Sequence, residues 1–148
     1  MIQAKTKEHT LASYWLLKTE PDSYSYADLE RDRIEKWDGV TNTTAQKNMR
    51  AMAAGDRCVI YHTGDERRAV GLATIVRGPY PDPTDIAGKL VLVDLSPDGA
   101  LARPVPLSTI KTMHIFEGSL LLRIGRLSVV PLDAAQFEAL ISKGHTFE

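Results

Sequence analysis

The chain of 148 residues has little of what several classes of protein require. Its single cysteine, Cys58, cannot form an internal disulfide, and no apolar run is long enough to span a bilayer. The first ten residues lack the apolar core of a secretory signal. These absences predict a cytoplasmic protein with no membrane partner. Residues 1–12 are expected to form a flexible tail ahead of a single domain over residues 13–148.

Motifs for metals and cofactors are also missing. The four histidines are scattered along the chain, and one cysteine cannot build a thiolate site. The sequence has no phosphate-cradling glycine loop, no dinucleotide fingerprint and no nucleophile elbow. We therefore predict no metal and no cofactor. His62 lies on a predicted strand, where a hydrogen-bonded structural histidine is favoured over a catalytic base.

Charge of either sign is nearly balanced, with a net value of −1. The segment from Arg31 to Arg77 holds nine Lys/Arg and six Asp/Glu, so it carries +3 and the remainder carries −4. A large surface for non-specific phosphate neutralisation is therefore not expected. The local excess fits either a modest basic region or an ordinary solvated helix face, and both interpretations stay open.

Hydrophobic patterning predicts a small α+β domain with a curled or barrel-like sheet. Capping-box patterns at Ser25, Thr43 and Asp133 predict three helices, with Ile34 facing inward at the end of the first helix and Gly55 ending the second. A helical turn is expected over 107–111, while residues 120–122 fit a helix or a buried strand. Proline-rich residues 78–83 are expected to form a loop, and residues 96–99 a tight turn. Strands are predicted over 13–18, 57–63, 69–76, 89–95, 101–105 and 125–131.

Residues 35–42 place a tryptophan beside an Asp-Gly turn signal, on what the pattern predicts to be a loop. Trp37 is too large to be held there unless it packs under other residues. Its indole either fills the core between two helices or forms a stacking platform for a planar ligand. The residues alone leave both interpretations open.

The contiguous residues Lys18, Thr19 and Glu20 offer a base, a nucleophile and an acid at the end of a predicted strand. Adjacent residues on an extended strand point to opposite faces, so the three side chains cannot all converge. An ordinary solvated strand terminus is therefore favoured over a catalytic cluster.

Seven short blocks, taken in order over residues 13 to 144, resemble the EVE domain. They are Tyr14–Pro21, Trp37–Asn42, Gly55-Asp56, Tyr61–Thr63, Val70-Gly71, Tyr80–Pro83 and Arg126–Val129. The resemblance implies a PUA-like pseudo-barrel of mostly antiparallel strands flanked by helices, shared with YTH domains. It also implies a pocket for a flipped, modified base, with modified cytosine in DNA favoured over RNA.

The resemblance assigns Trp37 to the aromatic wall of that pocket. Three positions depart from the family pattern: Thr19 and Thr63 stand where serine is usual, which keeps a hydroxyl, and Thr41 stands where arginine is common, which removes a cation beside Trp37. The candidates for the rim and floor of the pocket are Lys18, Thr19, Glu20, Asn42, Tyr61, His62, Thr63, Arg126 and Ser128.

The leading functional hypothesis is a non-catalytic reader of a modified nucleobase. An enzyme is the first alternative, because ASCH-type amidohydrolases of the same superfamily use Lys, Thr and Glu on modified cytidines. A protein-interaction module with a vestigial pocket is the second. The sequence leaves the oligomeric state open.

Overall fold

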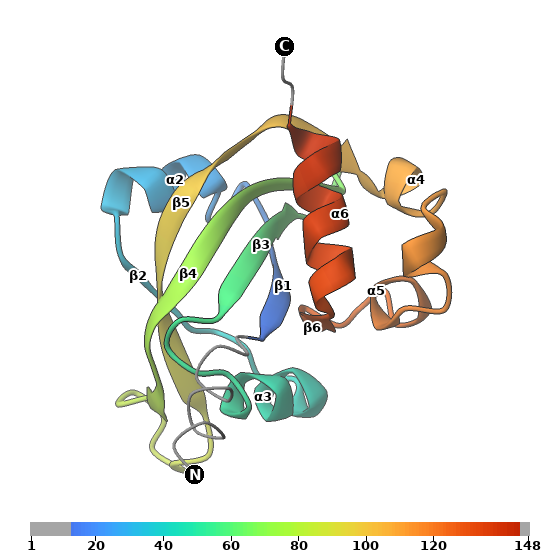
Figure 1. Ribbon diagram of the computed structural model, residues 1–148. Coiled ribbons are helices and arrows are strands. Elements are labelled where there is room, and N and C mark those ends of the chain that lie inside the picture. Colours follow the sequence, from blue (N-terminus) through green and yellow to red (C-terminus); the bar gives the residue numbers. More distant parts are fainter. Residues whose placement is uncertain (1–12, 146–148) are drawn as a thin grey trace, which may run out of the picture.

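The computed structural model describes residues 13–145, and the predicted tail, residues 1–12, lies outside them. The described residues form a mixed α+β domain built on one six-stranded sheet, in the order β2-β5-β4-β3-β1-β6 (Figure 1). All neighbouring strands are antiparallel except the β1 and β3 pair. The predicted fold class is therefore confirmed. The strands are β1 (Tyr14–Thr19), β2 (Glu35–Trp37), β3 (Arg57–His62), β4 (Arg68–Pro81), β5 (Val91–Pro106) and β6 (Val129–Leu132).

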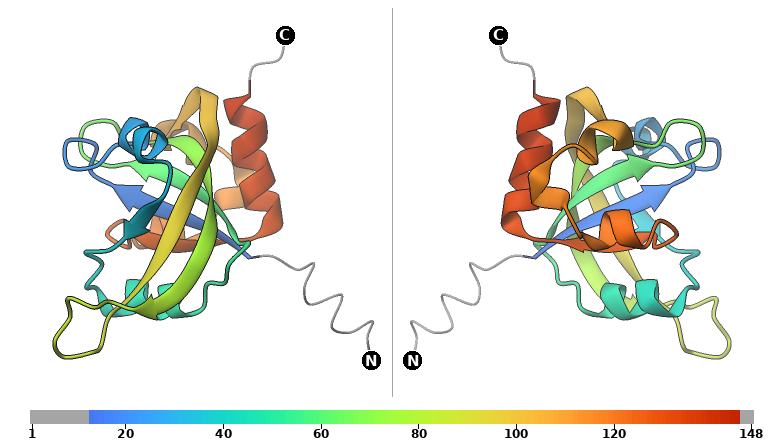
Figure 2. Two further views of the ribbon diagram at one scale, coloured as in Figure 1. Left: turned by 90° about the vertical axis from the view of Figure 1, so that its left-hand side faces the viewer. Right: turned by 90° about the vertical axis from the view of Figure 1, so that its right-hand side faces the viewer.

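Helices cover the curved sheet on more than one side (Figure 2). Helix α6 (Ala134–Gly144) packs on one side and α2 (Tyr26–Asp32) lies on the other, while α3 (Thr43–Arg50) closes the end near the β4–β5 loop. The helices are α2 (Tyr26–Asp32), α3 (Thr43–Arg50), α4 (Leu107–Ile110), α5 (Leu120–Arg123) and α6 (Ala134–Gly144), with a 3₁₀ turn η1 (His114–Phe116). Residues 120–122 are thus helical, which resolves the ambiguity of their sequence pattern.

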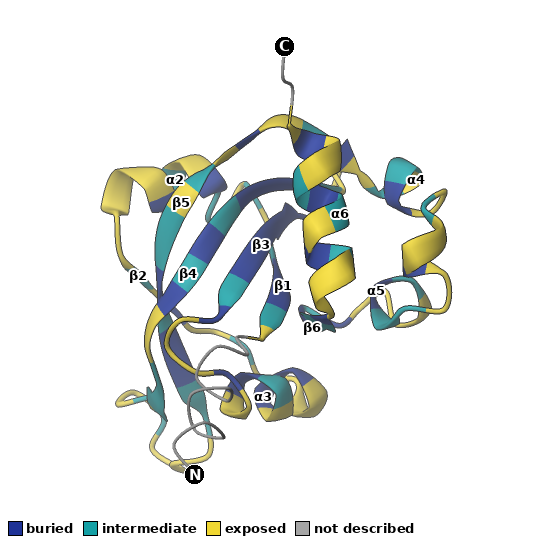
Figure 3. Ribbon diagram, viewed as in Figure 1, coloured by how far each residue is buried: buried dark blue, intermediate teal, exposed yellow. Residues whose placement is uncertain are grey.

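The core lies between the central strands and these helices (Figure 3). Strand β3 lies inside the sheet between β4 and β1, and it is buried from Cys58 to His62. Met49 and Met52 of the α3 region are buried. Asp56 is buried too, and its carboxylate accepts hydrogen bonds from the Trp15 indole and from backbone N–H groups. The Gly55-Asp56 block therefore fixes the start of the sheet.

Two of the three predicted capping boxes are confirmed, at Ser25 and Asp133. The third prediction is wrong by one residue, because Asn42 caps α3 by accepting a 2.9 Å hydrogen bond from the Ala45 N–H group. This helix ends at Arg50 rather than at Gly55. Helix α2 ends at Asp32, and Ile34 beyond it is 58% exposed, so its predicted inward position is also wrong.

The predicted turn at 96–99 is wrong because β5 runs through it, and the predicted loop at 78–83 is wrong as far as Pro81, where β4 ends. Strand β4 pairs with β3 only as far as Thr74, so Pro79 and Pro81 lie where one side of β4 needs no backbone donor. The pairing of β4 with β5 shifts register between Ala69 and Gly71, and again between Leu72 and Ala73. These shifts accommodate the extra residues of β5. The last predicted strand starts later than expected, at Val129.

Candidate functional site

A cavity of about 190 Å³ opens beside the tryptophan that the sequence singles out. Its wall comes from three parts of the chain: the end of β1, the turn that follows it, and β2 with the residue after it. Its lining residues are Thr19, Tyr24, Glu35, Lys36, Trp37 and Asp38. We refer to it as the Trp37 cavity.

Trp37 lies at the end of β2, opposite Val93 of β5, and not on a loop as predicted. Its side chain is only 8% exposed and belongs to the hydrophobic core. The Tyr24 ring meets it edge to face, with centroids 6.2 Å apart and planes at 80°. Trp37 thus packs in the core and also borders the cavity, and its role as a stacking platform stays a prediction.

Polar groups around the two rings are held by local hydrogen bonds. The Thr19 hydroxyl donates to the Tyr24 carbonyl at 2.7 Å, and the Tyr24 hydroxyl donates to Asp32 at 2.9 Å. Burial, followed by that hydrogen bond, raises the pKa of Tyr24 well above its usual value. Burial likewise raises the pKa of Glu35, with nearby Asp32 and Asp38 acting in the same direction. The cavity therefore offers a neutral phenol and a carboxyl group that is less acidic than usual.

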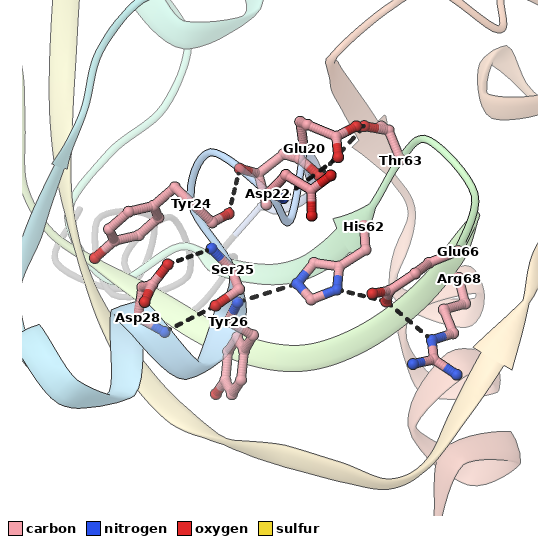
Figure 4. Close-up of polar contacts among 11 residues, drawn as sticks. Glu20, Asp22, Tyr24, Ser25, Tyr26, Asp28, His62, Thr63, Glu66 and Arg68 are labelled. Atoms are coloured by element: carbon pink, nitrogen blue, oxygen red, sulfur yellow. Dashed lines mark hydrogen bonds and ion pairs between the residues drawn. The ribbon is translucent and has the colours of Figure 1, made fainter.

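His62 lies beside the start of α2 and contacts Tyr26 and Glu66 (Figure 4). Its Nε2 accepts a 3.0 Å hydrogen bond from the Tyr26 N–H group, and its Nδ1 lies 2.8 Å from Glu66 Oε1. The Nδ1 hydrogen therefore points to Glu66, and this hydrogen bond lowers the pKa of the Glu66 carboxyl. Because both ring nitrogens are engaged, His62 is a hydrogen-bonded structural residue that fixes the start of α2 just after Tyr24.

The loop after Trp37 is held by a buried glutamine. The Gln46 amide donates to the carbonyls of Val40, at 2.8 Å, and Val91, at 3.2 Å. Its oxygen accepts from the Val91 N–H group at 2.9 Å. Asn42, a predicted rim or floor residue of the pocket, lies exposed on this loop and uses its oxygen to cap α3. Gln46 therefore anchors residues 38–42 to β5, while the Asn42 amide nitrogen remains available for a ligand.

Three predicted site residues border a different cavity, of about 160 Å³, on the other side of the β1 end. They are Lys18, Tyr61 and Thr63. The strand pleat explains the separation, because Lys18 and Thr19 are adjacent on β1 and face opposite ways. The structure thus divides the predicted pocket into two sites that share the end of β1.

The other predicted rim residues line neither cavity. Glu20 follows β1 and accepts hydrogen bonds from the Thr63 hydroxyl and the Asp22 N–H group, both at 3.3 Å (Figure 4). The Ser128 carbonyl accepts from the Lys18 N–H group at 2.9 Å, and Arg126 is exposed in the preceding turn. Their roles toward a ligand stay predictions.

Sequence reasoning missed four residues that line the Trp37 cavity: Tyr24, Glu35, Lys36 and Asp38. The pairing of β2 with β5 places Glu35 and Lys36, Asp38 follows directly after β2, and such distant pairing leaves no local pattern. Tyr24 carried a usable signal, since an aromatic residue directly before a capping box lies close to the start of a helix.

Two absences can be stated for residues 13–145. No group of three or more His, Cys, Asp or Glu side chains in this range could hold a metal ion. Within the same range, no helix combines the length and apolar character needed to cross a membrane.

Comparisons of the sequence and of the structure with known proteins found related groups of proteins. A family model described as the EVE domain matches residues 13–143. Thymocyte nuclear protein 1 of Mus musculus is 30% identical over 170 aligned residues, which cover 92% of this chain and 75% of that protein. Rpa0253 from Rhodopseudomonas palustris is 38% identical with a TM-score of 0.85, and the match covers 90% of this chain and 93% of that chain.

The human THYN1 protein has been solved in complex with 5-methylcytosine containing DNA. It is 27% identical to this chain with a TM-score of 0.84, and the match covers 93% of this chain and 100% of that chain. ASCH from Zymomonas mobilis is 13% identical with a TM-score of 0.55, over 87% of this chain and 94% of that chain. The ASCH likeness is one of fold alone.

Proposed function

Because this chain belongs to the EVE domain family and has its PUA-like fold, we propose that it is a non-catalytic reader that binds a modified cytosine of DNA in the Trp37 cavity. The observation that carries this proposal is the edge-to-face pair of Tyr24 and Trp37 at the wall of a polar cavity. The complex of human THYN1 with 5-methylcytosine containing DNA supports DNA as the partner.

The cavity has the groups that recognition of a flipped base requires. Stacking on an aromatic wall offsets the cost of unstacking the base, and hydrogen bonds read its Watson–Crick edge. The exocyclic amine of cytosine is a donor that carboxylates accept from, and Glu35 and Asp38 both line the cavity. Lys36 provides a donor for an acceptor atom of the base. The lining therefore suits a cytosine better than a base without an exocyclic amine.

A binding panel tests this proposal. We expect fluorescence anisotropy to show tighter binding to a single-stranded DNA with one 5-methylcytosine than to the same strand with cytosine or thymine. A methyl-sized group discriminates by only about 1–3 kcal/mol, so the preference should be about tenfold to two-hundredfold at most. The matching RNA strand is expected to bind more weakly. Equal affinity for all of these strands would contradict the proposal.

The amidohydrolase alternative predicts turnover, and we expect none. A nucleophile and its base must lie within hydrogen-bond reach, whereas Lys18 and Thr19 border different cavities. Incubation with N4-acetylcytidine should therefore give no product above the buffer rate, as measured by chromatography. Saturable product formation that Lys18→Ala abolishes would make the protein an enzyme.

A further inference from the structure

The cavity on the other side of the β1 end has a charge pattern that the Trp37 cavity lacks. Its lining includes two cations, Lys18 and Arg67, and contains no Asp or Glu. The remaining lining residues are Tyr61, Thr63, Gly64, Leu107, Leu121 and Gly125. We refer to it as the Lys18 cavity. Two basic side chains without a carboxylate favour an anionic ligand.

Lys18 is held in place at this cavity and keeps unused donor capacity. Its Nζ donates to the Gly125 carbonyl at 2.8 Å and lies 5.6 Å from the centroid of the Tyr61 ring. An ammonium group has three donors, so this bond leaves two for a ligand. Burial lowers the pKa of Lys18, which means that its charged form is poorly solvated and would gain from an anion beside it.

The charges next to this cavity are of both signs. An adjoining cavity shares Arg67 and Leu107 and adds Lys111. It also contains two carboxylates, Asp65 and Glu66, but Glu66 is engaged by His62 and by Arg68 at 3.2 Å.

The Lys18 and Trp37 cavities both border the end of β1. Lys18 and Thr19 are consecutive residues, and one borders each cavity. The Thr63 N–H group also donates to the Thr19 carbonyl at 2.9 Å, which ties β3 to the end of β1 between them. A nucleic acid strand that places a base in one cavity can therefore pass its backbone over the end of β1 to the other.

We propose that the Lys18 cavity binds a phosphate group, that of the strand whose base occupies the Trp37 cavity. This inference rests on the proposed function. A lysine and an arginine with a nearby hydroxyl form a suitable phosphate site, since most protein–DNA contacts to the backbone come from such side chains. The Glu20 carboxylate, bonded to Thr63, lies at the same edge and opposes phosphate binding by like-charge repulsion.

The test compares Lys18→Gln, Arg67→Gln and Lys143→Gln, which remove the same charge. Lys143 is an exposed residue of α6 and lines neither cavity, so it is the matched control. Affinity for the 5-methylcytosine strand and for its unmodified copy is measured by anisotropy over a range of salt. Each lost phosphate contact should reduce the slope of log affinity against log salt by about 0.7 for a single strand.

We expect the first two variants to show that reduction, and to lose affinity for both strands by the same factor. Lys143→Gln should keep the wild-type slope, and Lys18→Arg should restore it. Glu20→Gln should strengthen binding to both strands. Circular dichroism confirms that each variant is folded, and Arg67 in the exposed β3–β4 loop provides a variant with little risk to the fold.

A second arm separates a strand phosphate from a free one. Inorganic phosphate is titrated while amide NMR shifts of Gly64 and Gly125 are followed. Shifts that depend on Lys18, without any change of salt slope, would assign the cavity to free phosphate and overturn the link to the strand. Unchanged slopes and no shifts would overturn the site altogether. If the wild type shows no preference for 5-methylcytosine, only the proposed function is contradicted. The salt slopes of the variants do not depend on that preference, so they still test the phosphate site.

Discussion

Replacing Trp37 by alanine is expected to lower affinity for a 5-methylcytosine strand by about tenfold or more, since stacking on an aromatic ring contributes about 1–3 kcal/mol per base. The indole borders the cavity beside Tyr24, and no other tryptophan lines it. Anisotropy with the modified and unmodified strands measures the effect. The preference between the strands should shrink together with the affinity, because both depend on the base entering the cavity.

The same substitution should also destabilise the protein. Trp37 is 8% exposed and packs in the core, and truncation of a buried tryptophan to alanine costs about 3–5 kcal/mol. Binding must therefore be measured where circular dichroism and urea unfolding show that Trp37→Ala is folded. Trp37→Phe is the matched control, since it keeps a ring for stacking and should retain most of the affinity. A folded Trp37→Ala that binds both strands as the wild type does would make the indole a core residue alone.

The correct predictions of helix starts rest on local signals in the sequence. The capping boxes at Ser25 and Asp133 need only residues within one helical turn, so the sequence is enough to place them. The long strands could not be predicted in the same way. Pro79 is tolerated in β4 because β3 pairs with β4 only as far as Thr74. The sequence does not show how far this pairing extends. The place of Trp37 also depends on the pairing of β2 with β5.

Only part of the candidate site could be predicted, because the sequence indicated Trp37 and Thr19 but not the four other residues that line the Trp37 cavity. The resemblance brought Trp37, Thr19, Lys18 and Thr63 into one pocket, whereas the strand pleat separates them into two. The alternation rule already indicated that Lys18 and Thr19 diverge. It could not show that Lys18 would border a second cavity, because that cavity is closed by residues from α4 and α5.

Gly71 controls how α2 docks on the sheet, and its replacement by alanine is expected to lower the free energy of unfolding by about 1–3 kcal/mol or more. A Cβ atom at this position would lie 2.4 Å from the Tyr26 ring. That ring cannot move freely, because its hydroxyl donates to the Leu72 carbonyl at 2.6 Å and accepts from the Gly99 N–H group at 2.9 Å. Urea unfolding followed by circular dichroism measures the loss.

The effect should reach the Trp37 cavity, since Tyr26 opens α2 two residues after Tyr24 and is also bonded to His62. Gly71→Ala should therefore weaken binding to the 5-methylcytosine strand as well. Gly125→Ala is the control for stability, because a Cβ atom there meets nothing within 4 Å, and it should change stability by less than about 0.5 kcal/mol. In a Tyr26→Leu background the cost of Gly71→Ala should fall sharply, since the ring that causes the overlap is gone. An equal cost in both backgrounds would show that the overlap with Tyr26 is not its origin, and that Gly71 is required by the strand itself.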